Sequence, residues 1–255
     1  MKASQVIVVL GLCLLNAACV TTSSGPEPAS AEEAAVANMN LGIGYLRQGR
    51  PEVAVDALER AIDLNPRLAP AHSALAIAYG QLNETETAEQ HHRRATQLAP
   101  DNSDVQNAYA VFLCLHNRWK DAEPYFERAV SNPRYSTPAV ARVNAGNCAR
   151  DANDLEKAEA NYRAALELEP RNSDALDGMI ELSVLQENFL QARAFIQRSF
   201  AAHSPTAREL ALCHYAEQQL ENQEAANDCL RQLRTGFPES PELARILGSQ
   251  SNATP

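Results

Sequence analysis

The chain has 255 residues and a formal net charge of −10, so its acidic balance argues against a nucleic-acid partner and against a basic patch for membrane surfaces. Aromatic residues make up only 5% of the sequence and there are 10 glycines, whereas alanine and leucine are abundant. This composition disfavours a sheet-rich domain and favours packed helices. We therefore expect an all-α protein.

Residues 1–18 have the organisation of a cleaved export signal. Lys2 provides a positive start, residues 6–15 are apolar, and two alanines precede Cys19. A bilayer core is about 30 Å thick, so an apolar run this short cannot cross it as a helix. We interpret the segment as a signal peptide, which implies that the mature chain is exported.

The residues around the cleavage point, Leu15-Asn16-Ala17-Ala18-Cys19, resemble a bacterial lipobox. The resemblance implies cleavage before Cys19 and lipid attachment to that cysteine. By comparison with known lipoproteins, Val20 lacks the aspartate associated with inner-membrane retention, which favours the outer membrane. The alternative is an ordinary secretory signal in which Cys19 is incidental.

Residues 19–34 are expected to form a flexible tether. The segment from Thr21 to Glu33 is composed of Thr, Ser, Gly, Pro, Ala and Glu and shows no apolar periodicity. Such a composition offers too little apolar surface to offset the entropy of ordering.

A pattern of small and large residues then repeats with a period of 34, broken once by a two-residue insertion within 135–138. In the first unit, two successive helices and a terminating proline are marked by Leu41, Gly42, Tyr45, Ala54, Leu58, Ala61 and Pro66. Proline ends the second helix because it lacks the amide and clashes with the preceding turn. The six predicted units cover 35–68, 69–102, 103–138, 139–172, 173–206 and 207–240.

This spacing resembles the tetratricopeptide repeat, a helix-turn-helix unit of 34 residues. One hairpin cannot bury its apolar face alone, so neighbouring units must stack. The resemblance implies a right-handed α-solenoid whose concave side is lined by the first helix of each unit. Residues 241–255 are expected to form a capping helix, with a frayed tail from Gly248.

Four cysteines other than Cys19 remain after cleavage, and export places them where disulfides can form. In the repeat frame, Cys114 and Cys148 lie on neighbouring first helices, and Cys213 and Cys229 lie on the two helices of one hairpin. This geometry favours those two pairs among three possible pairings. The alternative is four buried thiols that behave as small apolar side chains.

In tetratricopeptide proteins, positions 2, 5, 9, 12 and 13 of the first helix face the groove. The first three units place there Val36, Met39, Ile43, Leu46, Arg47, Ser73, Ile77, Gln81, Asn107 and Val111. An open apolar groove of this kind would take an extended peptide or an amphipathic helix. Farther along, Asp174, Asp177 and Glu181 make the groove acidic. The alternative is that the tether or an extension of the first helix covers the apolar end.

The sequence contains none of the common catalytic or metal-ligand motifs. The sequence has no Gly-rich phosphate loop, no G-x-S-x-G and no H-E-x-x-H. No cysteine pair has C-x2-C spacing, and His91 and His92 are adjacent on one helix, so they point about 100° apart and cannot hold one ion. We expect a non-catalytic protein without cofactor, metal or small-molecule substrate. A redox-active thiol protein using Cys114 and Cys148 is a distant alternative.

Over nearly its whole length the chain resembles the type IV pilus biogenesis and stability lipoproteins, the PilW/PilF pilotin family. Similar local sequences are residues 41–46, 107–113 and 144–146, the insertion around Tyr135, and the pair Cys114 and Cys148. The resemblance implies a lipid-anchored protein on the periplasmic face of the outer membrane. Its partner would be the pilus secretin, whose targeting, multimerisation or stability it would promote. A general periplasmic scaffold for envelope assembly is the alternative.

Overall fold

The computed structural model describes residues 30–252 and contains thirteen helices and no strand within that range. Their bounds are α1 Ala31–Arg47, α2 Pro51–Leu64, α3 Ala69–Gln81, α4 Thr85–Leu98, α5 Ser103–Leu115, α6 Trp119–Ser131, α7 Pro138–Asp151, α8 Leu155–Leu168, α9 Ser173–Leu185, α10 Phe189–Ala202, α11 Ala207–Gln219, α12 Gln223–Gly236 and α13 Pro241–Asn252. None of the helices described is long and apolar enough to span a membrane. The all-α prediction is confirmed.

Consecutive helices pair as hairpins, from α1 with α2 to α11 with α12. Each hairpin turns through one residue with positive φ at the same place in the unit: Gly49, Asn83, Asn117, Asn153, Glu187 and Glu221. A left-handed residue after the first helix satisfies its terminal carbonyls and reverses the chain. The recurring turn is consistent with the six units predicted from the period.

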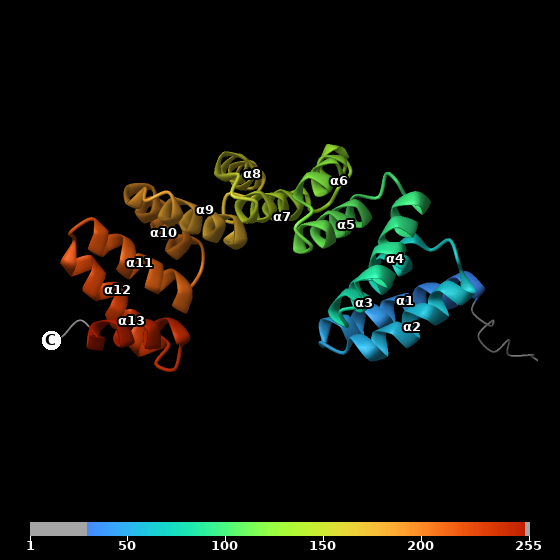
Figure 1. Cartoon of the computed structure of the whole chain (residues 1–255), viewed down its shortest axis with the longest axis horizontal. Coiled ribbons are helices and arrows are strands. Elements are labelled where there is room, and N and C mark those ends of the chain that lie inside the picture. The colour runs from blue at the N-terminus through green and yellow to red at the C-terminus, as the bar shows by residue number, and fades with distance from the viewer. Residues whose placement is uncertain (1–29, 253–255) are drawn as a thin grey trace, which may run out of the picture.

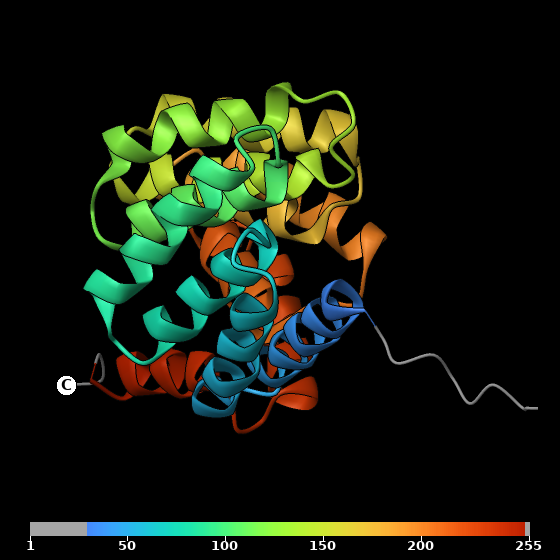
Figure 2. The same cartoon turned by 90° about the vertical axis from the view of Figure 1, so that its right-hand side faces the viewer.

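The hairpins stack into an open arch, shown in Figure 1 and from the side of α1 and α2 in Figure 2. Each odd-numbered helix contacts the next odd-numbered helix, whereas even-numbered helices make no comparable contact with one another. In Figure 1, α5 and α7 lie on the inner side of the arch, and α6 and α8 lie on its outer side. The first helices therefore line the concave face of the solenoid.

Close approach within a hairpin depends on small residues at defined places. A Cβ atom at Gly42 would lie 2.5 Å from Cγ of Leu58 and 3.2 Å from the carbonyl oxygen of Ala54. Leu58 is fully buried between the helices. Gly42 therefore sets the distance between α1 and α2, as the period suggested.

The ends of the solenoid differ from the sequence prediction. The helix α1 already begins at Ala31, because Ser30 and Glu33 form a capping box in which each side chain accepts from the other residue's amide. The tether predicted over 19–34 was therefore wrong for its last four residues. At the other end, α13 continues through Gly248 to Asn252, into the segment expected to fray, and residues 253–255 lie outside the described part of the chain. The predicted signal peptide and Cys19 lie outside the described residues.

Candidate protein-binding groove

An apolar column runs across the first three inner helices. It consists of Ile43 on α1, Ile77 on α3 and Val111 on α5, which occupy the same position of successive units. Neighbouring inner helices contact one another, so these side chains follow one another along the concave face. Ile77 is 40% exposed, and Ile43 and Val111 are half-buried. Exposed apolar surface of this kind is typical of interaction sites.

The other groove residues predicted on the first helix differ in exposure. Val36 and Arg47 are exposed, while Met39 and Leu46 are half-buried. Met39, Ile43 and Leu46 pack against a cluster built by α2 and α3. The N-terminal end of the groove is thus partly covered by its own neighbouring unit.

On the next two inner helices, Gln81 is exposed and Asn107 is half-buried, with Asn107 Oδ1 accepting from Asn144 Nδ2 at 3.1 Å. Ser73 is only 7% exposed, because the start of α3 is packed on nearly all sides. Ser73 therefore offers little surface to a partner, although its position in the repeat suggested otherwise.

Farther along the concave face, charges are paired between successive inner helices. Glu181 on α9 lies 2.8 Å from Nη1 of Arg150 on α7 and 2.7 Å from Nη2 of Arg208 on α11. Two guanidinium groups thus compensate this carboxylate. The sequence indicated an acidic groove here, but in the structure the charge of Glu181 is balanced by arginines from the units on either side.

Asp177, another of these acids, lies beside Glu209 and His203. Burial and the neighbouring Glu209 carboxylate raise the pKa of Asp177 to about 7. A proton shared between two close carboxylates relieves their repulsion. Asp177 is therefore turned toward the junction of two units.

Both predicted disulfides are present in the structure. Cys114 on α5 is bonded to Cys148 on α7, with Cα atoms 5.6 Å apart, and Cys213 on α11 is bonded to Cys229 on α12, with Cα atoms 6.0 Å apart. The first bridge links two units and the second closes one hairpin.

The adjacent histidines point in different directions, as expected. His92 is buried, stacks on Tyr109 with ring centroids 5.5 Å apart, and burial lowers its pKa to about 3. Its neighbour His91 turns to α3, where its Nδ1 lies 3.0 Å from Nδ1 of His72. This contact within the second hairpin was not visible in the sequence, because it depends on how α3 and α4 pack.

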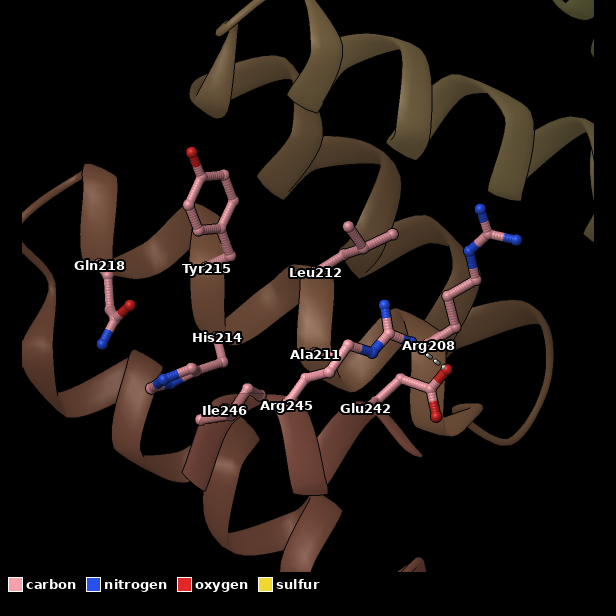
Figure 3. Close-up of a pocket in the computed structure, with 9 residues that line it drawn as sticks. All are labelled: Arg208, Ala211, Leu212, His214, Tyr215, Gln218, Glu242, Arg245 and Ile246. Carbon is pink, nitrogen blue, oxygen red and sulfur yellow. Dashed lines mark hydrogen bonds and ion pairs between the residues drawn. The ribbon is translucent and has the colours of Figure 1, made fainter. Parts of the chain in front are cut away.

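A cavity of about 590 Å³ opens at the C-terminal end between α11 and α13 (Figure 3). Arg208, Arg245 and Glu242 gather on one side of it, and Tyr215 and Gln218 lie toward the other. Tyr215 occupies the position of the apolar column in the sixth unit, and it is exposed. The repeat pattern does not reveal this cavity, because it forms where α13 packs across α11.

A second cavity, of about 450 Å³, lies between α6, α7 and α8. Its apolar wall includes Trp119, Phe126 and Ala149, and Lys120 and Lys157 are among its charged residues. The indole Nε1–H of Trp119 is buried and has no hydrogen-bond partner. This cavity is formed mainly by outer helices, so it is separate from the concave groove.

Family models of the tetratricopeptide repeat match residues 32–101, 73–137 and 139–172. The three matches together extend from α1 to the end of the fourth hairpin. They agree with the helix pairing and the positive-φ turns seen in the structure.

Similar proteins include an uncharacterized protein of Haemophilus influenzae, 31% identical over 54% of this chain and 76% of its own length. The type IV pilus assembly protein PilF of Pseudomonas aeruginosa is 26% identical over 83% of this chain and 84% of its own. The solved structure of P. aeruginosa PilF has a TM-score of 0.74 at 24% identity and covers 87% of this chain and 100% of that one. The crystal structure of PilW, described as a widely conserved type IV pilus biogenesis factor, has a TM-score of 0.76 at 26% identity and covers 84% of this chain and 98% of that one. The chain belongs to the tetratricopeptide-repeat proteins and is a homologue of the type IV pilus biogenesis proteins PilF and PilW.

Proposed function

We propose that this protein is a lipoprotein of the outer membrane, facing the periplasm, that binds the type IV pilus secretin and promotes its targeting, multimerisation or stability. The homologues support a role in pilus biogenesis. The observation that carries the binding role is the apolar column of Ile43, Ile77 and Val111 on the concave face.

The column suits an apolar stripe of a partner polypeptide. Successive inner helices present one apolar side chain each, so an extended segment or an amphipathic helix laid across them would meet a row of them. Beyond α5 the same position carries Asn147 and then Glu181, which is paired with two arginines. The partner's apolar contacts would therefore end at the third unit.

A charge placed in the column tests the groove. Ile77→Glu is the sharpest variant, because Ile77 is 40% exposed and the substitution leaves the core intact. Met39→Glu and Ile43→Glu are less selective, since both side chains pack against α2 and α3. The matched control is Leu190→Glu on α10, an outer helix, where the leucine is 66% exposed.

We expect Ile77→Glu to lose co-purification of the secretin while keeping its helix content, and Leu190→Glu to retain the partner. Equal recovery of the secretin with both variants would move the binding site away from the column.

Two genetic measurements address the remaining parts of the proposal. Deleting the gene should abolish secretin multimers on a non-reducing gel, and unaltered multimers would favour a general envelope scaffold instead. Cys19→Ala should release the protein from the outer-membrane fraction. Its retention there would contradict lipid anchoring at Cys19.

A further inference from the structure

Three side chains of the kinds that ligate metals converge where the fifth and sixth hairpins meet. They are Asp177 on α9, His203 at the C-terminal cap of α10 and Glu209 in the first turn of α11. One potential ligand atom from each lies within 4.8 Å of the other two. Asp177 lies on an earlier helix than His203 and Glu209, and the sequence contains no ligand-spacing motif that joins the three.

His203 is oriented by its own loop. Its Nδ1–H donates to the carbonyl oxygen of Ser204 at 3.0 Å, which directs Nε2 to the interior. There Nε2 lies 2.8 Å from Oγ of Ser199 and 3.6 Å from Oε1 of Glu209. Histidines that bind metals are commonly fixed in this way, with the second ring nitrogen held by a carbonyl.

The carboxylate of Glu209 is also fixed in place, by hydrogen bonds at the N-terminal cap of α11. Its Oε2 accepts from the amide of Thr206 at 2.8 Å and from the hydroxyl of Thr206 at 2.9 Å. These bonds leave Oε1 turned toward Ser199 and His203. The Glu209 side chain is 2% exposed, whereas that of His203 is 26% exposed, so the cluster is reached from the histidine side.

In the part of the chain that the structure describes, the carboxylates of Asp177 and Glu209 have no permanently charged cation beside them. Asp177 Oδ1 is buried without a hydrogen-bond partner. No lysine or arginine within residues 30–252 forms an ion pair with Asp177 or Glu209, and the nearby Arg208 pairs with Glu181. By contrast, the buried carboxylate of Glu217 in the same hairpin is matched by Arg193. Two adjacent carboxylates without a permanent cation must either share a proton or bind a cation to relieve their repulsion.

We propose that Asp177, His203 and Glu209 bind a zinc ion. One imidazole nitrogen and two carboxylate oxygens form a ligand set that zinc accepts, and a water would complete four-coordination. For bonds of about 2 Å, tetrahedral ligands stand roughly 3.3 Å apart. The 3.6 Å between His203 Nε2 and Glu209 Oε1 is close to that value, and Asp177 offers an oxygen within 4.8 Å of both atoms.

A bound ion would join α9, the loop after α10 and α11. Because these elements belong to different hairpins, zinc would stabilise the junction between the fifth and sixth units. A ligand that binds only the folded state raises stability in this manner.

The test is calorimetric titration of zinc chloride into tag-free protein that has been stripped with a chelator. We expect one zinc per chain, a higher melting temperature with zinc, and much weaker binding of magnesium and calcium, which prefer sites made of oxygen alone. His203→Gln and Asp177→Asn should each weaken zinc binding about tenfold or more and remove the thermal shift. Asp177→Asn leaves the cap of α11 intact, so it remains informative should His203→Gln unfold.

Two control variants change the same residue types at comparable places outside the proposed site. His116→Gln changes another histidine at a helix C-terminal cap, and Asp174→Asn changes an exposed acid on α9. Both should bind zinc as the unchanged protein does. The proposal is overturned if no zinc binds, if Asp177→Asn binds zinc normally, or if His91→Gln alone abolishes binding, which would assign the ion to the contact between His72 and His91.

Discussion

Gly178 on α9 lies directly against the ring of Tyr162 on α8, and a Cβ atom at this glycine would stand 2.5 Å from the ring carbon Cε1. Tyr162 is fully buried, and its hydroxyl donates to Oδ1 of Asn147 on α7 at 2.7 Å. The ring therefore fills the space between the fourth and fifth hairpins. The missing side chain at Gly178 sets how closely these two units stack.

The first prediction concerns this contact. Gly178→Ala should lower the free energy of unfolding by about 1–3 kcal/mol, because the added methyl overpacks a site already filled by Tyr162. Denaturant unfolding followed by circular dichroism measures the change.

Gly80→Ala is the matched control, since Gly80 is also helical and a Cβ there meets nothing within 4 Å. It should stabilise the protein by up to about 1 kcal/mol, the difference in helix propensity between glycine and alanine. Equal effects of the two substitutions would show that helix propensity, and not the contact with Tyr162, governs Gly178.

A second prediction concerns pH. Burial lowers the pKa of His92 to about 3, whereas an unfolded histidine has a pKa near 6.5. Between these values only the unfolded state binds the proton, so the stability present above pH 6.5 is lost as the pH falls. For this residue the loss at pH 5 is about 2 kcal/mol relative to pH 8.

His92→Leu isolates this contribution, because Leu58 occupies the same position of the first unit. The unfolding free energy of the variant should fall less between pH 8 and pH 5, by about 2 kcal/mol. His72 and His91, whose pKa values are also lowered mainly by burial, remain in both proteins and cancel in the comparison. An unchanged pH dependence would mean that His92 is protonated in the folded state.

The fold was predictable because the packing information repeats. Small residues such as Gly42 and large ones such as Leu58 recur with one period, and each contact they make is local to one hairpin or its neighbour. The same frame placed Cys114 beside Cys148, since equivalent first helices stack. The polar composition of residues 21–33 pointed to a tether, although Ser30 and Glu33 have the spacing of a capping box and start α1 at Ala31.

The site was predictable only in part. Position in the repeat identified which helix face carries Ile77, but it could not show that Ser73 is covered by its neighbours. Nor could it show that Arg150 and Arg208 neutralise Glu181, because that depends on where long side chains reach between units.

A third prediction concerns the disulfides. The bridge between Cys114 and Cys148 spans 34 residues, and the bridge between Cys213 and Cys229 spans 16. By loop entropy, replacing both Cys114 and Cys148 with alanine should lower the unfolding free energy by roughly 4 kcal/mol. Replacing both Cys213 and Cys229 should lower it by roughly 3 kcal/mol. Urea unfolding with and without a reducing agent measures both losses. Full stability in the reduced protein would show that neither bridge restrains the unfolded chain.

A fourth prediction rests on the contact between α10 and α11. Arg193 Nε and Nη2 lie 2.7 Å and 2.5 Å from the two oxygens of Glu217, whose side chain is only 7% exposed. Arg193→Ala would leave this buried carboxylate without its partner, at a cost of about 2–3 kcal/mol.

The matched control is Arg163→Ala, which removes an exposed pair with Glu159 one turn earlier on α8. Exposed pairs of this kind contribute less than about 1 kcal/mol, because water and salt screen both charges. Adding Glu217→Gln to Arg193→Ala should recover part of the loss, since a neutral amide is cheaper to bury than an unpaired charge. If the double variant is no more stable than Arg193→Ala alone, the loss comes from the packing of the arginine stem and not from the stranded carboxylate.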